Sequence, residues 1–277
     1  MLRPRLLVAI VLVPIAVRVI YLGGAWYLAG VLIMLTGAGR EYVNLMRAGG
    51  RQPALPLVLL GIWFLSLAPL LAPGSLDRIG LTAFLIVATF WHLVQFERAK
   101  PNAASDWAAT IAGAVYIGAL GSFFLLLRHL PEGLWWTAIV YPSIWLSDTG
   151  AFVGGSFLAG RFLGRHAMVP KLSPKKTWEG FVSGVVWGTT FGALFGAFWE
   201  IASGPGSRLG FWPGAIVGLV VSLAGPIGDL AISMLKRQVG LKDTGSALAG
   251  HGGMLDRIDS WLVAGAAGYY CILLLLR

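Results

Sequence analysis

A dense polar stretch lies between two apolar segments near the C-terminal end of the chain. Residues 225–260 hold four of the 12 acidic residues, with basic residues and one histidine among them. The acids are Asp229, Asp243, Asp256 and Asp259, and the other charged or titratable residues are Lys236, Arg237, Lys242, His251 and Arg257. Carboxylates and cations gathered at this density between apolar flanks predict that the chemistry of the protein occurs here.

The first part of this stretch predicts a helix with one polar face. Asp229, Ser233 and Lys236 are spaced i, i+4 and i+7, which places their side chains on one side of a helix. A carboxylate near the end of an apolar segment is costly to desolvate, so it is functional or paired by default. Two interpretations follow: a functional Asp229, or an Asp229–Lys236 ion pair that closes the helix end.

Two glycine-containing turns follow, at residues 242–245 and 250–253. Glycines beside a basic loop let backbone N–H groups approach an anion closely. The alternative is an ordinary connecting loop, because the pattern is neither a Walker loop nor a dinucleotide fingerprint.

Asp256 and Asp259 open the last apolar segment at i and i+3, near a helix N-terminus where the dipole tolerates negative charge. Helix capping is the structural alternative, above all for Asp259. For Asp256 the sequence favours a metal, because Mg²⁺ is typically held by one or two carboxylates together with substrate phosphates.

A second polar cluster lies upstream. Asp148 interrupts an apolar segment, and a lone acid in such a segment usually faces a polar interior. Lys175 and Lys176 precede the next segment. They either line a pocket or act as topological charges, with Ser173 or Thr177 capping the helix that follows.

The elements that must position these residues are transmembrane helices. The chain has 277 residues, of which 57% are hydrophobic and only 12% charged, against about 25% charged in soluble domains. We therefore expect an all-α, polytopic integral membrane protein of about nine transmembrane helices. The expected spans are residues 6–22, 25–39, 55–72, 80–97, 107–127, 133–155, 177–200, 211–235 and 259–276.

Charge placement orients these spans. Most of the 21 Lys and Arg residues fall on the side that carries the N-terminus and the loops near 40–54, 98–106, 160–176 and 236–258. The positive-inside rule assigns that side, including the active-site loops, to the cytoplasm of a cell or inner-membrane protein. The first segment is expected to be an uncleaved anchor. We expect residues 1–130 to form a scaffold for dimerisation or lipid access, and residues 131–277 to form the catalytic region.

The net charge of +9 does not indicate nucleic acid, because the basic residues are confined to short loops between apolar segments. Membrane lipids or a phosphorylated substrate fit that charge. The lone Cys271 excludes an intramolecular disulfide and a cysteine metal cage. Glycines recur every four residues from Gly180 to Gly196, which predicts a smooth face for close helix packing.

Considered without any family, these residues describe a membrane enzyme with a cytoplasm-facing site in its C-terminal half. Carboxylates, lysines, arginines and glycines suit Mg²⁺-assisted transfer at a phosphate, which depends on positioning and charge neutralisation more than on a protein nucleophile.

The long spaced pattern is more specific than any of its parts. It runs from Ser233 through Lys236-Arg237 and Lys242-Asp243-Thr-Gly245 to Gly250-His-Gly-Gly-Met-Leu-Asp256-Arg-Ile-Asp259. This pattern resembles the signature of the phosphatidate cytidylyltransferase family, the CDP-diacylglycerol synthases. Residues 147–152 and 173–180 resemble that family's other motifs.

The resemblance implies that CTP and phosphatidic acid are converted to CDP-diacylglycerol and pyrophosphate, with Mg²⁺ bound by Asp229 and Asp256 and room for a second cation. It also implies a homodimer. The cations expected to neutralise the phosphates are Lys236, Arg237, Lys242 and Arg257. Asp243 and Asp259 would orient those cations or a metal-bound water. The residues expected to contact phosphate or complete the substrate pocket are Asp148, Ser173, Lys175, Lys176, Ser233, His251, Gly252 and Gly253.

Two alternatives remain. A related CTP-dependent transferase would act on another lipid phosphate or on a polyprenol. A transporter also holds intramembrane acids, but it more often shows paired repeats, and the chain has no such internal symmetry. The D-x-x-D-G-x-x-A-R pattern of CDP-alcohol phosphotransferases is absent.

Overall fold

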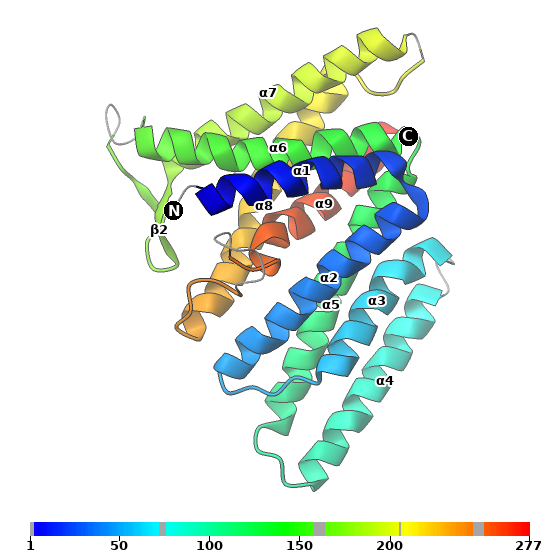
Figure 1. Ribbon diagram of the computed structural model, residues 1–277, viewed down its shortest axis with the longest axis vertical. Coiled ribbons are helices and arrows are strands. Elements are labelled where there is room, and N and C mark those ends of the chain that lie inside the picture. Colours follow the sequence, from blue (N-terminus) through cyan, green and yellow to red (C-terminus); the bar gives the residue numbers. More distant parts are fainter. Residues whose placement is uncertain (1–2, 72–75, 158–163, 205, 246–251) are drawn as a thin grey trace. The chain divides into compact units, whose positions relative to one another are not determined.

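The computed structural model describes residues 3–71, 76–157, 164–204, 206–245 and 252–277, and these form nine helices and one two-stranded hairpin (Figure 1). The helices are α1 (Arg3–Leu22), α2 (Gly24–Ala48), α3 (Leu55–Leu71), α4 (Leu76–Glu97), α5 (Ala103–His129), α6 (Gly133–Val153), α7 (Trp178–Ser203), α8 (Phe211–Gln238) and α9 (Leu255–Leu275). Each expected span falls on one of them. Within the described residues, 5 helices are long and apolar enough to cross a membrane, namely α4 from Arg78, α5, α7, α8 and α9. The prediction of an all-α, multi-pass membrane protein is thereby confirmed at this level.

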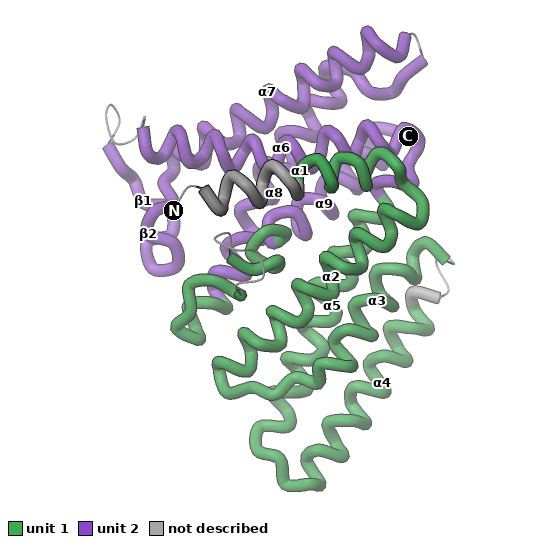
Figure 2. Tube along the Cα trace, viewed as in Figure 1, with its two compact units in different colours: residues 1–126, 235–258 green, residues 127–234, 259–277 purple. Residues whose placement is uncertain are grey.

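The chain divides into two compact units, and the division passes through three helices, α5, α8 and α9 (Figure 2). Unit 1 comprises Met1–Leu126 and Leu235–Ile258, and unit 2 comprises Leu127–Met234 and Asp259–Arg277. The end of α8 and the start of α9 therefore belong to unit 1. The functional division into residues 1–130 and 131–277 remains a prediction.

Unit 1 is built on the packing of α2, α3, α4 and α5. Tyr42 of α2 lies against Gly113 of α5, and its hydroxyl donates a 2.9 Å hydrogen bond to the Ala109 carbonyl. Ile62 of α3 reaches Gly39 of α2. The segment 235–258 packs on the same helix α2, because Val239 lies against Gly49 and Met254 against Gly37. Helix α2 is thus a rigid support for the segment that carries most of the predicted site.

Unit 2 is held together by the glycine face of α7. A Cβ at Gly184 would lie 2.6 Å from the Ser147 carbonyl oxygen of α6, and one at Gly192 would lie 2.3 Å from the Gly214 carbonyl oxygen of α8. The helices approach so closely that only glycine fits between the two backbones, which confirms the predicted packing role of this repeat.

The basic loop at 160–176 contains a hairpin that the sequence analysis did not predict. Strands β1 (Ala167–Val169) and β2 (Ser173–Thr177) pair antiparallel. Thr177 then caps α7, since its hydroxyl oxygen accepts a 3.1 Å hydrogen bond from the Gly180 amide. Of the two expected caps, Thr177 is therefore the correct one, and Ser173 lies in β2. The hairpin gives Lys175 and Lys176 defined positions.

Glu132 closes the other end of unit 2, between α5 and α6. Its carboxylate accepts hydrogen bonds from the Trp199 indole at 3.2 Å, the Ser207 hydroxyl at 2.8 Å and the Arg208 amide at 3.0 Å. Burial opposes ionisation, but these donors outweigh it and hold the pKa of Glu132 below its usual value. Glu132 thus ties the α7–α8 connection to the start of α6.

A Gly192→Ala substitution is expected to lower the thermal unfolding midpoint, because overpacking against a backbone carbonyl costs about 1–3 kcal/mol. The matched control is Gly225→Ala in α8, where the nearest atoms to a new Cβ are Ile144 Cγ2 at 3.5 Å and Ser260 Cβ at 3.8 Å. That variant should match or exceed the wild type, since alanine favours helix by up to about 1 kcal/mol. Tryptophan fluorescence in detergent measures both midpoints, and equal stability of the two variants would refute the close-packing role.

Glu132 is also expected to make the thermal stability of the protein depend on pH. Because its folded pKa is depressed, its stabilisation is complete above the unfolded-state pKa of about 4.3 and disappears as the pH falls through the folded value. The wild type should therefore lose more thermal stability than Glu132→Gln between about pH 6 and about pH 3. Parallel melting curves for the two proteins across this range would contradict the assignment.

Candidate functional site

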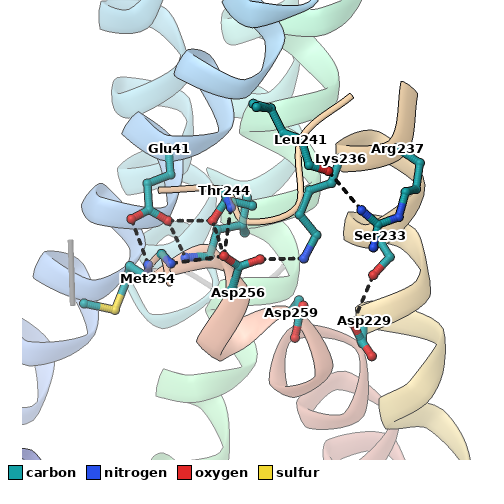
Figure 3. A network of polar contacts seen from close by, with 12 residues as sticks. Glu41, Asp229, Ser233, Lys236, Arg237, Leu241, Thr244, Met254, Asp256 and Asp259 are labelled. Carbon is teal, nitrogen blue, oxygen red and sulfur yellow. Dashed lines mark hydrogen bonds and ion pairs between the residues drawn. The ribbon is translucent and has the colours of Figure 1, made fainter. Parts of the chain in front are cut away.

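A buried carboxylate on α2 holds the loop between α8 and α9 (Figure 3). Glu41 is 8% exposed. Its Oε1 accepts the Met254 amide at 2.8 Å, and its Oε2 accepts the Leu255 amide at 2.8 Å and the Thr244 hydroxyl at 3.0 Å. The two amides are the first N–H groups at the start of α9, which a helix cannot satisfy by itself. Glu41 therefore caps a helix more than 200 residues away in the sequence.

Asp256 is the second acceptor of this network. Its Oδ2 accepts the Thr244 amide at 2.8 Å, the Thr244 hydroxyl at 3.0 Å and the Gly253 amide at 3.0 Å, while its Oδ1 accepts from Lys236 Nζ at 2.6 Å. The side chains of Lys236 and Asp256 are each 9% exposed. Asp256 is thus held on every side by donors of its own unit (Figure 3).

The glycines of the loop make room for this carboxylate pair. A Cβ at Gly253 would lie 2.2 Å from both Glu41 Oε2 and the Thr244 hydroxyl oxygen, and one at Gly245 would lie 2.8 Å from Glu41 Oε1. Gly252 has φ +78, a left-handed conformation that glycine adopts without strain. The glycine pattern therefore has a structural cause within the loop. The phosphate contacts expected of Gly252 and Gly253 remain a prediction.

A smaller charged cluster lies in unit 2. Asp229 Oδ1 accepts a 3.2 Å hydrogen bond from Ser233, which confirms that these two side chains share a helix face. Asp229 Oδ2 pairs with Lys176 of β2, and Asp148 of α6 interacts electrostatically with both Asp229 and Lys176. The structure thus brings Asp148, Lys176, Asp229 and Ser233 together.

The ion-pair interpretation of Asp229 and Lys236 is wrong. Lys236 pairs with Asp256 in unit 1, and Asp229 pairs with Lys176 in unit 2. The spacing along α8 correctly predicted that Asp229 and Ser233 share a helix face. The ion-pair partners of Asp229 and Lys236, however, lie on β2 and α9.

The remaining predicted residues are placed as follows. Arg237 is exposed and donates a 3.1 Å hydrogen bond to the Leu241 carbonyl. Asp259 is buried, and its Oδ1 accepts the Ser260 amide at 2.6 Å. Ser173 is half-buried in β2. The other exposed members of the predicted set are Lys175, Lys242, Asp243 and Arg257. His251 lies outside the described residues.

Sequence reasoning missed Glu41. The apolar pattern predicts a span that ends at residue 39 and a basic cytoplasmic loop from residue 40, whereas α2 continues to Ala48. An acid directly beside an apolar segment is costly unless paired, and that rule applied to Glu41 would have marked it as a candidate. Its hydrogen-bond partners at the start of α9 are 213 and 214 residues away, so local spacing could not have predicted these contacts.

The sequence predicts a divalent cation at Asp229 and Asp256, bound together with substrate phosphates. Within the described residues there is no group of three or more His, Cys, Asp or Glu side chains that could hold a metal. Mg²⁺ needs fewer, since one or two carboxylates commonly suffice when phosphates complete the shell. Asp229 Oδ2 and Asp256 Oδ1 each already face a cation, the ammonium of Lys176 and of Lys236 respectively. Binding of Mg²⁺ by Asp229 and Asp256 therefore remains a prediction.

Comparison with known proteins gives a consistent result over the whole chain. The model of the cytidylyltransferase family matches residues 3–275. A phosphatidate cytidylyltransferase of Synechocystis sp. is 31% identical over 305 residues, covering 98% of this chain and 97% of that protein. One from Mycobacterium bovis is 31% identical over 263 residues, with 90% and 81% covered. One from Staphylococcus haemolyticus is 28% identical over 267 residues, with 94% and 95% covered.

Asp256→Asn is expected to destabilise the fold itself. The substitution leaves Lys236 without its carboxylate and turns an amide N–H₂ toward other donors, and breaking a buried ion pair costs about 3–5 kcal/mol. Asp243→Asn, in the same loop but exposed, should stay within about 0.5 kcal/mol of the wild type. Thermal melting in detergent compares the two, and an unchanged midpoint for Asp256→Asn would show that the network contributes little.

Proposed function

We propose that this chain, which belongs to the cytidylyltransferase family, transfers the cytidylyl group of CTP to phosphatidic acid, yielding CDP-diacylglycerol and pyrophosphate. The observation that carries the proposal is the match along nearly the full length. The family model covers residues 3–275, and the relative from Synechocystis sp. is called a phosphatidate cytidylyltransferase.

The charged groups of the site support this chemistry. An oxygen of the lipid phosphate forms a bond to the α-phosphorus of CTP, and the bond from that phosphorus to the pyrophosphate oxygen breaks. The substrate supplies the nucleophile, so the protein must orient the phosphates and neutralise their charge. We assign this task to Lys236, Arg237, Lys242 and Arg257, with Asp243 and Asp259 orienting those cations.

The unit 2 cluster supplies the expected pocket residues. Lys176 is held by Asp229, so its ammonium has a fixed place before any substrate binds. A preorganised cation stabilises developing charge without reorganisation during the reaction. We propose that Lys176, with Lys175, Asp148, Ser173 and Ser233, contacts substrate phosphate, and that His251, Gly252 and Gly253 do so from the loop.

We propose Mg²⁺ as the cofactor, with Asp229 and Asp256 as its protein ligands and room for a second cation. When bound, the ion would neutralise negative charge on the phosphates. The support is the residue type, because Mg²⁺ is typically held by one or two carboxylates together with substrate phosphates.

The membrane arrangement follows from charge and length. We propose nine transmembrane segments corresponding to α1–α9, with the N-terminus and the site-bearing loops in the cytoplasm, because the basic residues concentrate in those loops. Phosphatidic acid lies in the bilayer, so membrane lipids surround the site. A homodimer is proposed on the family resemblance.

Purified protein in detergent should incorporate labelled CTP into lipid only when phosphatidic acid and Mg²⁺ are both present. Chelation should abolish the reaction and added Mg²⁺ should restore it. Asp229→Asn should lower the rate more than tenfold, because a tenfold loss corresponds to only about 1.4 kcal/mol and a metal supplies several.

The same assay separates the neighbouring activities. Replacing phosphatidic acid by a polyprenol phosphate or an ether-lipid phosphate, and CTP by ATP, GTP or UTP, should give little product. Faster turnover of another lipid phosphate would reassign the substrate. A rate that is insensitive to chelation, or a loss below tenfold in Asp229→Asn, would remove the proposed metal role of this residue.

A further inference from the structure

We infer that Glu41 is a positioning residue for the reaction: from α2 it holds Thr244, Met254 and Leu255, and through them it keeps Lys236 and Asp256 in place for the roles proposed above. This inference rests on the proposed function. The hydrogen bonds of Glu41 go to Thr244, Met254 and Leu255, so we assign it an action through these residues.

The loop depends on these contacts for its conformation. Between the end of α8 at Gln238 and the start of α9 at Leu255, the described residues form neither helix nor regular strand. The described amides there therefore lack the repeating partners of secondary structure, and side-chain acceptors take their place. Glu41 and Asp256 together accept the amides of Thr244, Gly253, Met254 and Leu255.

Glu41 is well suited to this task because its own position is fixed. The adjacent Tyr42 and Val43 are 5% and 0% exposed, and Tyr42 bonds to α5. The carboxylate has no lysine or arginine partner among the ion pairs of the described residues. Its charge is instead compensated by loop donors at the positive end of α9. If the loop left this position, Glu41 would lose its hydrogen bonds, so carboxylate and loop stabilise each other.

Thr244 couples Glu41 to Asp256. Its hydroxyl oxygen lies 3.0 Å from Glu41 Oε2 and 3.0 Å from Asp256 Oδ2. A hydroxyl has a single proton to donate, so the two carboxylates share this donor. The positions of the two acids are therefore linked. Asp256 also fixes Lys236, whose Nζ donates a 2.6 Å hydrogen bond to Asp256 Oδ1. A change at Glu41 is transmitted through the Thr244 side chain to Asp256, the proposed metal ligand, and to Lys236, the proposed phosphate-neutralising cation.

The kinetic consequence is specific. If the loop holds its binding conformation only part of the time, the apparent affinity for CTP falls in proportion to that fraction. Glu41→Gln keeps the shape of the side chain but turns an N–H₂ group toward at least one donor. We expect KM for CTP to rise about tenfold, the effect of losing one hydrogen bond to a charged group, while KM for phosphatidic acid changes far less.

The experiment compares Glu41→Gln, Thr244→Val and Thr244→Ser with the control Glu97→Gln, which alters an exposed acid at the end of α4. Kinetic constants for CTP and melting midpoints are measured for each. Thr244→Val should raise KM for CTP as Glu41→Gln does. Thr244→Ser, which keeps the hydroxyl, should have a KM for CTP close to that of the wild type. The effects of the two substitutions should not add in the double variant, because both interrupt one path.

Hydrogen–deuterium exchange supplies a readout that needs no turnover. In the absence of CTP, Glu41→Gln should speed exchange in peptides containing Met254 and Leu255, while peptides of α5 and the Glu97→Gln protein keep the wild-type rate. If the wild type fails to use CTP, the proposed function is wrong, yet the exchange result still decides whether Glu41 holds the loop. Wild-type exchange and KM in Glu41→Gln would overturn the inference. So would a fall in kcat that parallels a general loss of stability without a local change in exchange.

Discussion

A buried carboxylate in an apolar chain must find hydrogen-bond donors, and the arrangement of unit 1 depends on how Glu41 does so. No lysine lies beside it among the ion pairs of the described residues. The donors come from the unsatisfied amides at the start of α9 and from Thr244. The Glu41 carboxylate and the amides at the start of α9 thus each offset the cost of burying the other without a hydrogen-bond partner. This pairing, with the contacts of Val239 and Met254 against Gly49 and Gly37, places residues near both ends of the α8–α9 connection on α2.

The composition of the loop follows from that pairing. Gly245 and Gly253 leave space that the Glu41 carboxylate and the Thr244 hydroxyl occupy, and a single methyl group at Gly253 would collide with both. Asp256 then accepts four hydrogen bonds while its partner Lys236 stays buried. An ion pair of this kind is weak evidence for stability, but removing either partner is costly. The residues assigned to catalysis are therefore also residues on which the local fold depends, and rate and stability must be measured together.

Much of the helical framework was predictable. Apolar segment length and charge spacing located nine helices in the described residues, and the four-residue glycine period predicted the close packing of α7. The predictions failed where a segment's ends or partners depend on contacts. Helix α2 runs past the apolar segment to Ala48, and a hairpin occupies the basic loop before α7. Both exceptions mix charged and apolar residues and lie outside the continuous apolar segments from which the spans were predicted.

The sequence by itself determined which residues are candidates for the chemistry, because carboxylates, lysines and glycines at fixed spacing are written directly in it. It also determined which side chains share a helix face, as for Asp229 and Ser233, since that relation is local. Only the tertiary structure decided the pairing. Lys236 bonds to Asp256 and Lys176 to Asp229, and Glu41 reaches the start of α9. The physical reason is that a charge is satisfied by whichever donor or acceptor the packing brings within about 3 Å, and sequence distance does not enter that condition.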